Sequence, residues 1–197
     1  MNEVIVLTAE KSCPDETTLW NRLLESGLSR LHVRKPALTA AETGRLLAQL
    51  DVAYRPRVSV HYYPQLALDY GLGGVHYSYQ ILPATSTESR LLTSCSVHSW
   101  AEQRVVQDRV DYCFLSPVFD SISKQGYGQN ANLWRVPSSL NSSKVYALGG
   151  IQRQNLQQVF EAGFRGAALL GAIWQAPDPV QAYRGIIQEL NAYLSNL

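Results

Sequence analysis

Residues 145–151 read Val-Tyr-Ala-Leu-Gly-Gly-Ile, and residues 166–173 read Gly-Ala-Ala-Leu-Leu-Gly-Ala-Ile. Each is a short apolar run that leads directly into glycine, and a helical pattern from Asn155 to Ala162 lies between them, closed by Gly163. Backbone amides after a buried strand, followed by a helix N-terminus, can hold a phosphate group. Two such turns in succession are typical of the phosphate site after the last two strands of a strand–helix barrel. The alternative is that the glycines only form tight turns.

Strand and helix patterns alternate along the rest of the chain. Apolar runs predict eight strands, at residues 4–7, 31–33, 58–60, 74–76, 93–96, 112–115, 145–148 and 167–170. Helical spacing predicts helices at 17–26, 40–50, 64–70, 99–106, 155–162 and 180–194, whereas the crossovers at 85–92 and 131–140 carry weak patterns. Strict alternation implies a parallel sheet, and eight repeats favour its closure. We therefore predict an α/β fold, a (β/α)8 TIM barrel that forms one domain over residues 1–197.

Composition and charge exclude several classes of protein. The chain has 197 residues and a net charge of +1 without basic or acidic blocks, which gives no support for nucleic-acid or membrane-surface binding. No apolar run approaches the ~20 residues of a membrane span, and residues 4–7 are too short for a signal peptide. The cysteines Cys13, Cys95 and Cys113 are odd in number and widely spaced, which favours a reduced cytoplasmic protein over a disulfide scaffold or a zinc site.

Polar side chains follow several predicted strands, at the end where barrel enzymes carry their catalytic groups. In chain order they are His32 and Arg34, His61 and Tyr62, His76, Ser96 and His98, and then Ser121, Ser123 and Lys124. The four histidines are thus expected at one barrel mouth, although each alone could be a hydrogen-bonded structural residue. Imidazole suits zinc, iron or nickel, but no paired carboxylate accompanies the histidines, so a metal site is the less favoured interpretation. General acid–base chemistry is favoured because histidine titrates near neutral pH.

The order and spacing of several motifs resemble the thiamine phosphate synthase and thiazole tautomerase superfamily over nearly the whole chain. Residues 61–76 are similar to the family's Asn-Asp, Ala-Leu and Gly-Val-His motifs, and residues 96–98 to its Ser-x-His. The further matches are Asp-Tyr at 111–112, Ser-Pro-Val-Phe at 116–119, Ser-Ile-Ser-Lys at 121–124, Ala-Leu-Gly-Gly-Ile at 147–151 and Ala-Ile at 172–173. No single motif is specific, whereas their order and spacing together are.

The resemblance implies substrates and binding roles. The family synthase joins a pyrimidine pyrophosphate to a thiazole phosphate: pyrophosphate leaves with the help of Mg²⁺, and the thiazole nitrogen traps the pyrimidine cation. Carried onto this chain, the pyrophosphate-binding residues are Arg34, Ser96, Ser121, Ser123 and Lys124, and the thiazole phosphate cradle is Gly149, Gly150, Gly171 and Ala172. The family's Gln-x-Arg-x-Lys becomes His-Val-Arg-Lys-Pro at 32–36, so its lysine is lost, although Lys35 is adjacent.

The family's magnesium site is not matched. Its two carboxylate positions hold Tyr62 and Ile81 here, and neither side chain can replace a hard oxygen ligand. The tautomerase branch also lacks these carboxylates, but it carries a histidine where this chain has Pro117. We therefore expect no cofactor, with Mg²⁺ as the weaker alternative.

Three functions remain open. The favoured one is an isomerase of thiazole phosphate metabolism that moves protons with His98 or His76 as base, with His61 and His32 ranked next. The second is a thiamine phosphate synthase whose leaving-group site is rebuilt, through His61 and Lys124. The third is a non-catalytic binder of thiazole phosphate or thiamine phosphate. In each case the partner is a small phosphorylated thiazole or pyrimidine, and homodimerisation is left open.

Overall fold

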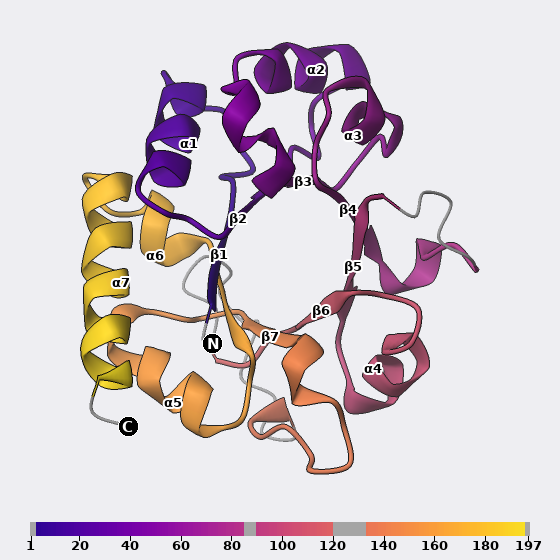
Figure 1. The fold of residues 1–197 in the computed structure, drawn as a ribbon, viewed down its shortest axis with the longest axis vertical. Coiled ribbons are helices and arrows are strands. Elements are labelled where there is room, and N and C mark those ends of the chain that lie inside the picture. The colour runs from indigo at the N-terminus through magenta and orange to yellow at the C-terminus, as the bar shows by residue number, and fades with distance from the viewer. Residues whose placement is uncertain (1–2, 85–89, 120–132, 196–197) are drawn as a thin grey trace.

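A computed structural model describes residues 3–84, 90–119 and 133–195. Eight parallel strands form a closed barrel in which each strand pairs with the next and β8 returns to β1 (Figure 1). The strands are β1 (Glu3–Leu7), β2 (Arg30–Val33), β3 (Val58–Val60), β4 (Gly74–Ser78), β5 (Leu92–Val97), β6 (Tyr112–Leu115), β7 (Val145–Leu148) and β8 (Gly166–Leu169). The predicted (β/α)8 barrel is confirmed, and the predicted strands agree with the observed ones to within two residues at each end.

Helices surround the barrel on its outside (Figure 1). They are α1 (Glu16–Glu25), α2 (Ala40–Ala48), α3 (Gln65–Asp69), α4 (Trp100–Val106), α5 (Leu156–Glu161), α6 (Gly171–Trp174) and α7 (Pro179–Leu194). Short 3-10 turns lie at η1 (Val52–Arg57), η2 (Tyr79–Ile81), η4 (Ser142–Lys144) and η5 (Arg153–Asn155). The two weak crossovers show no α-helix among their described residues. No helix in the described ranges is long and apolar enough to cross a bilayer.

Side-chain caps set where several helices begin. The Thr39 hydroxyl accepts the backbone N–H of Glu42 at 3.3 Å, and the Glu42 carboxylate accepts the N–H of Thr39 in return. Ser99 accepts the N–H of Glu102 at 3.1 Å and starts α4. Such caps satisfy amides that have no partner within the helix. The helix predicted to reach Leu50 instead ends at Ala48, because the following turn buries Leu50 without continuing the helix.

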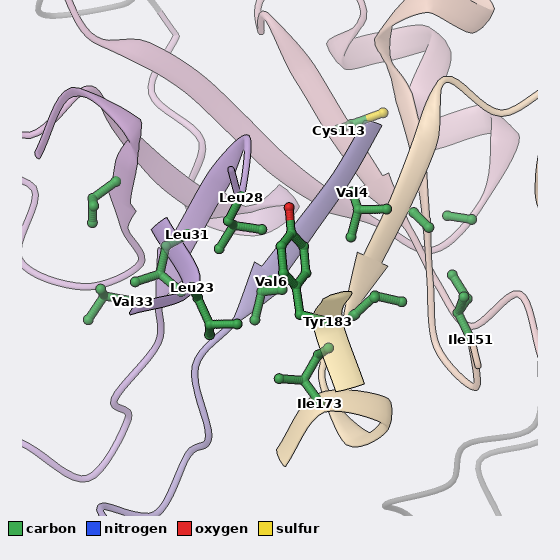
Figure 2. Packing of buried hydrophobic residues seen from close by; sticks show 14 of the residues in the cluster. Val4, Val6, Leu23, Leu28, Leu31, Val33, Cys113, Ile151, Ile173 and Tyr183 are labelled. Carbon is green, nitrogen blue, oxygen red and sulfur yellow. The ribbon is translucent and has the colours of Figure 1, made fainter. Parts of the chain in front are cut away.

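Residues of the strands alternate between the outside and the inside of the barrel. Val4 and Val6 of β1 face the helices, and Figure 2 shows them with Leu28, Ile173 and Tyr183 in the main core cluster. Ile5 instead belongs to a second, inner cluster, whose members are Ile5, Leu7, Tyr112, Phe114, Tyr146 and Ala168. This cluster fills the side of the barrel interior between β6 and β1.

The opposite side of the barrel interior is polar. The inward positions of β2 to β5 hold side chains that can form hydrogen bonds, and four of them are almost fully buried: His32, Ser59, His76 and Ser94. Buried polar groups need partners, because an unpaired one costs free energy. The interior of the barrel is therefore divided into an apolar half and a hydrogen-bonded half, and the latter leads to the candidate site.

Candidate functional site

A pocket of about 400 Å³ opens at the carboxyl ends of the strands. Its volume lies in the range of small-molecule sites, and its position is that of active sites in barrels of this kind. Eight residues predicted from the sequence line it: Arg34, His61, His76, Ser96, His98, Gly149, Gly150 and Gly171. The polar residues Glu10, Ser78 and Ser116 also line it and were not predicted.

The glycines that follow β7 and β8 form one wall of this pocket. Gly149 and Gly150 have φ values of 100° and 63°, a backbone region that side-chain-bearing residues rarely adopt. A Cβ atom on Gly149 would lie 3.0 Å from Cα of Pro117, so the bare backbone is also needed for packing. Gly171 is the first residue of α6, which follows the neighbouring strand β8. The first amides of a helix have no acceptor within it. Ala172 follows Gly171 but packs against the core and does not line the pocket.

Arg34 follows β2, which β1 separates from β8, and lines another wall of the pocket. Its guanidinium donates to the carboxylate of Glu10, which follows β1, and its backbone N–H donates to Thr8 Oγ1 at 2.9 Å. Both partners of this ion pair are partly exposed, so the arginine stays within reach of an anion in the pocket. Glu10 could have been found in the sequence as a polar residue soon after the first predicted strand.

Three histidines meet below and beside the pocket. His32 Nδ1 lies 3.0 Å from His61 Nε2, and His32 Nε2 lies 2.6 Å from the hydroxyl of Tyr112. The ring centroids of His61 and His76 are 4.0 Å apart and stacked, whereas the ring of His32 stands at 80° and 78° to these two. The prediction that all four histidines lie at the mouth is wrong for His32. It pairs in register with Leu7 and Ser59, is fully buried, and does not line the pocket.

His76 is held as a neutral imidazole by two serines. Ser94 Oγ donates to the carbonyl of Val75 at 3.2 Å and therefore accepts the Nδ1–H of His76 at 2.9 Å. The lone pair of Nε2 then faces Ser96 Oγ at 2.8 Å. Burial, with a smaller contribution from the charge of Arg34, lowers the pKa of His76 to about 3. A group with so low a pKa is a weak general base at neutral pH.

His32 and His61 are neutral for the same reason. Burial is the largest cause that holds their pKa values well below the usual value, and the neighbouring His76 adds to it in both cases. Burial also raises the pKa of the Tyr112 hydroxyl, which stays protonated beside His32. His32, His61 and Tyr112 are therefore neutral groups joined by hydrogen bonds, and they reach the pocket at His61.

His98 lies apart from these three rings and is exposed at the pocket rim. Its Nδ1 lies 3.0 Å from the carbonyl oxygen of Ser116, which can only accept, so Nδ1 carries the proton. This leaves a lone pair on Nε2, for which the part of the chain that the structure describes shows no hydrogen-bond donor. Glu102 Oε2 accepts the backbone N–H of His98 at 2.7 Å and fixes the turn that carries the ring. Among the described histidines, His98 has the geometry best suited to accept a proton from a bound molecule.

The residues present do not fit a magnesium ion of the kind that the family resemblance implies. Tyr62 and Ile81 line the pocket at the two positions in question and are 37% and 64% exposed. Glu10 is the one carboxylate among the described lining residues, and Arg34 already binds it. Mg²⁺ needs oxygen ligands that these side chains do not supply. Lys124, Ser121 and Ser123 lie outside the described residues.

The sequence and the fold are similar to those of known proteins. Residues 4–173 match the model of the family described as thiamine monophosphate synthase. The chain is 30% identical over 200 residues to the thiamine-phosphate synthase of Thermus thermophilus, covering 94% of this chain and 95% of that protein. The solved thiamine phosphate pyrophosphorylase of Bacteroides thetaiotaomicron is 28% identical with a TM-score of 0.78, covering 96% and 98% of the two chains. That of Pyrococcus furiosus, 22% identical with a TM-score of 0.82 and 96% coverage of both chains, shares the fold.

Proposed function

Because the chain belongs to the thiamine monophosphate synthase family, we propose that it is a thiamine-phosphate synthase whose leaving-group site is rebuilt. The observation that carries the proposal is the pocket itself. It brings the amides of Gly149, Gly150 and Gly171 to one wall and the guanidinium of Arg34 to another. Two anionic groups can thus be held at once, as the joining of two phosphorylated substrates requires.

The proposed reaction uses these two walls differently. The glycine amides would hold the phosphate of the thiazole and so orient its ring nitrogen. The bond between the pyrimidine methylene carbon and the pyrophosphate oxygen breaks, the electron pair leaves with pyrophosphate, and the thiazole nitrogen donates its lone pair to the carbon. Arg34 would bind the leaving pyrophosphate, with an N–H of His61 as a further donor, because negative charge accumulates there. Ser96 would join them by turning its hydroxyl from His76 Nε2 towards the pocket. Lys124, Ser121 and Ser123 join this set by resemblance alone.

The test is single-turnover formation of thiamine phosphate from the pyrimidine pyrophosphate and the thiazole phosphate, with and without added Mg²⁺. We expect product whose rate does not depend on added Mg²⁺, and a strong loss of rate in Arg34→Met. Product that requires Mg²⁺ would contradict a rebuilt site. If thiazole phosphate binds but no product forms in either condition, the protein is a binder rather than a synthase.

A second candidate, a tautomerase-like isomerase, is favoured by His98. The carbonyl of Ser116 holds its proton on Nδ1, and Nε2 is free to accept a proton from a bound thiazole. Its test follows the exchange of a thiazole phosphate proton with deuterium from solvent. We expect His98→Gln to slow exchange by ~10²–10⁴-fold while phosphate binding is unchanged. No exchange in the wild-type protein would remove this candidate. A cytoplasmic location and a homodimer also stay predictions.

A further inference from the structure

We propose that His32, His61 and His76 form a binding site for a divalent transition-metal ion of the zinc type. Each of the three residues offers one imidazole nitrogen, and these three atoms all lie within 4.8 Å of one another. In a tetrahedral zinc site with Zn–N bonds of about 2.0–2.1 Å, two ligand nitrogens are roughly 3.3 Å apart. His32 Nδ1 and His61 Nε2 are already 3.0 Å apart, whereas the stacked rings of His61 and His76 have to turn relative to each other before both nitrogens face one ion.

The remaining ring nitrogens support this assignment. A histidine that binds a metal through one nitrogen normally has the other held by an oxygen, which fixes its tautomer and orientation. His76 has its Nδ1 held by Ser94 Oγ, which leaves Nε2 as the ligand atom; an ion there would replace the hydrogen bond of Nε2 with Ser96 Oγ, 2.8 Å away. The hydroxyl of Tyr112 holds His32 Nε2, which leaves Nδ1 as the ligand atom. His61 then needs only to carry its proton on Nδ1 for Nε2 to bind the ion.

Two cations lie near the cluster. Arg34 pairs with the carboxylate of Glu10, and Arg30 donates to the neutral Ser59 Oγ at 3.2 Å. Sites of three histidines hold zinc in enzymes without a protein carboxylate, so the lack of paired acidic residues does not argue against the ion.

The ligand type decides the class of ion. Imidazole suits Zn²⁺, Co²⁺ and Ni²⁺, whereas Mg²⁺ prefers oxygen ligands. The cluster is also distinct from the positions of Tyr62 and Ile81, where the family resemblance would place magnesium. Since His61 and His76 line the pocket, an ion bound by the three rings would have an open position towards it. Three protein ligands and one open position are the arrangement of catalytic rather than structural zinc.

The experiment is a titration of the full-length, metal-free protein with Co²⁺, followed by the visible d–d absorption that imidazole-bound cobalt develops, and by competition with Zn²⁺. A Cys13→Ser background removes the exposed thiol as an alternative ligand. We expect one ion per chain. Because loss of even an outer partner of a ligand costs ~10–100-fold in affinity, His61→Gln should weaken binding by more than about 100-fold.

His98→Gln is the matched control, since it removes a histidine of the same pocket that lies outside the cluster. It should bind Co²⁺ as tightly as the parent protein. Circular dichroism checks that each variant is folded. If His61→Gln does not fold, the test is repeated with His76→Gln. Failure of the folded parent to bind Co²⁺, equal binding by the parent and the His61 variant, or an equal loss in the His98 variant would overturn the proposal. Binding is measured without substrate, so the result does not depend on the proposed reaction.

Discussion

Mild acid should destabilise this protein steeply, because His32, His61 and His76 are neutral when it is folded. Burial is the main cause that lowers their pKa values below that of a histidine in an unfolded chain, which is about 6.5. Below that pH the unfolded chain binds protons that the folded protein does not take up. The contribution of these neutral histidines to the free energy of unfolding is therefore fully present above about pH 6.5. It is lost progressively as the pH falls towards their pKa values in the folded protein.

The size of the effect follows from the number of histidines in the cluster. Each histidine that stays neutral in the folded state lowers the free energy of unfolding by about 1.2 kcal/mol when the pH falls from 7 to 5.5. Three such residues predict a loss of about 4 kcal/mol, which is a large part of the ~5–15 kcal/mol that stabilises a typical protein. Carboxylates contribute little over this range because they ionise near pH 4.

The assay is urea unfolding followed by circular dichroism at pH 7 and pH 5.5, with a chelator present so that no bound ion stabilises the folded state. His61→Gln keeps a polar side chain at a half-buried position and removes one of the three titrating groups. Its loss of stability between the two pH values should be about 2.5 kcal/mol, two-thirds of the wild-type value. Equal unfolding free energies at both pH values in the wild-type protein would refute the reasoning.

Three further substitutions test other parts of the structure. Gly171→Val should weaken thiazole phosphate binding, measured by calorimetry, and leave the fold intact; equal affinity would argue against the amide cradle. Gly73→Ala would place a Cβ atom 1.8 Å from the carbonyl oxygen of Pro56, so we expect a loss of about 1–3 kcal/mol in urea unfolding. Lys35→Met leaves the buried carboxylate of Glu16 without its partner and should cost about 3–5 kcal/mol, most of which the added Glu16→Gln change should restore.

The barrel could be predicted from the sequence because its strands are buried on both faces. Parallel strands of this kind appear as short apolar runs between turn residues, and the predicted bounds of β6 and β7 match the observed ones. The helical crossovers were less predictable, because their helices are short and depend on packing. The turn η2, for example, carries no helical period at all, and the end of α2 is set by how Leu50 is buried.

The site could be predicted only as far as residues could be placed at strand ends. The strand that carries His32 is predicted to its correct end, Val33, but the sequence does not reveal the register with Leu7 and Ser59 that buries the ring inside the barrel. The ring contacts among His32, His61 and His76 depend on neighbouring strands and have no local signal. Glu10 differs from them, since its place soon after the first predicted strand is a local signal in the sequence.

One wall of the pocket consists of backbone groups and the other of side chains. Family membership therefore predicts the groups of the first wall better than those of the second. The phosphate wall consists of backbone amides, so it requires only the positive φ values of Gly149 and Gly150 and the start of α6. The other wall consists of side chains, and there two residues, Tyr62 and Ile81, are enough to remove the oxygen ligands of a magnesium ion. The proposed phosphate site therefore rests on backbone turns of the fold, whereas the proposed chemistry of the leaving group has to be argued from Arg34 and the histidines of this chain.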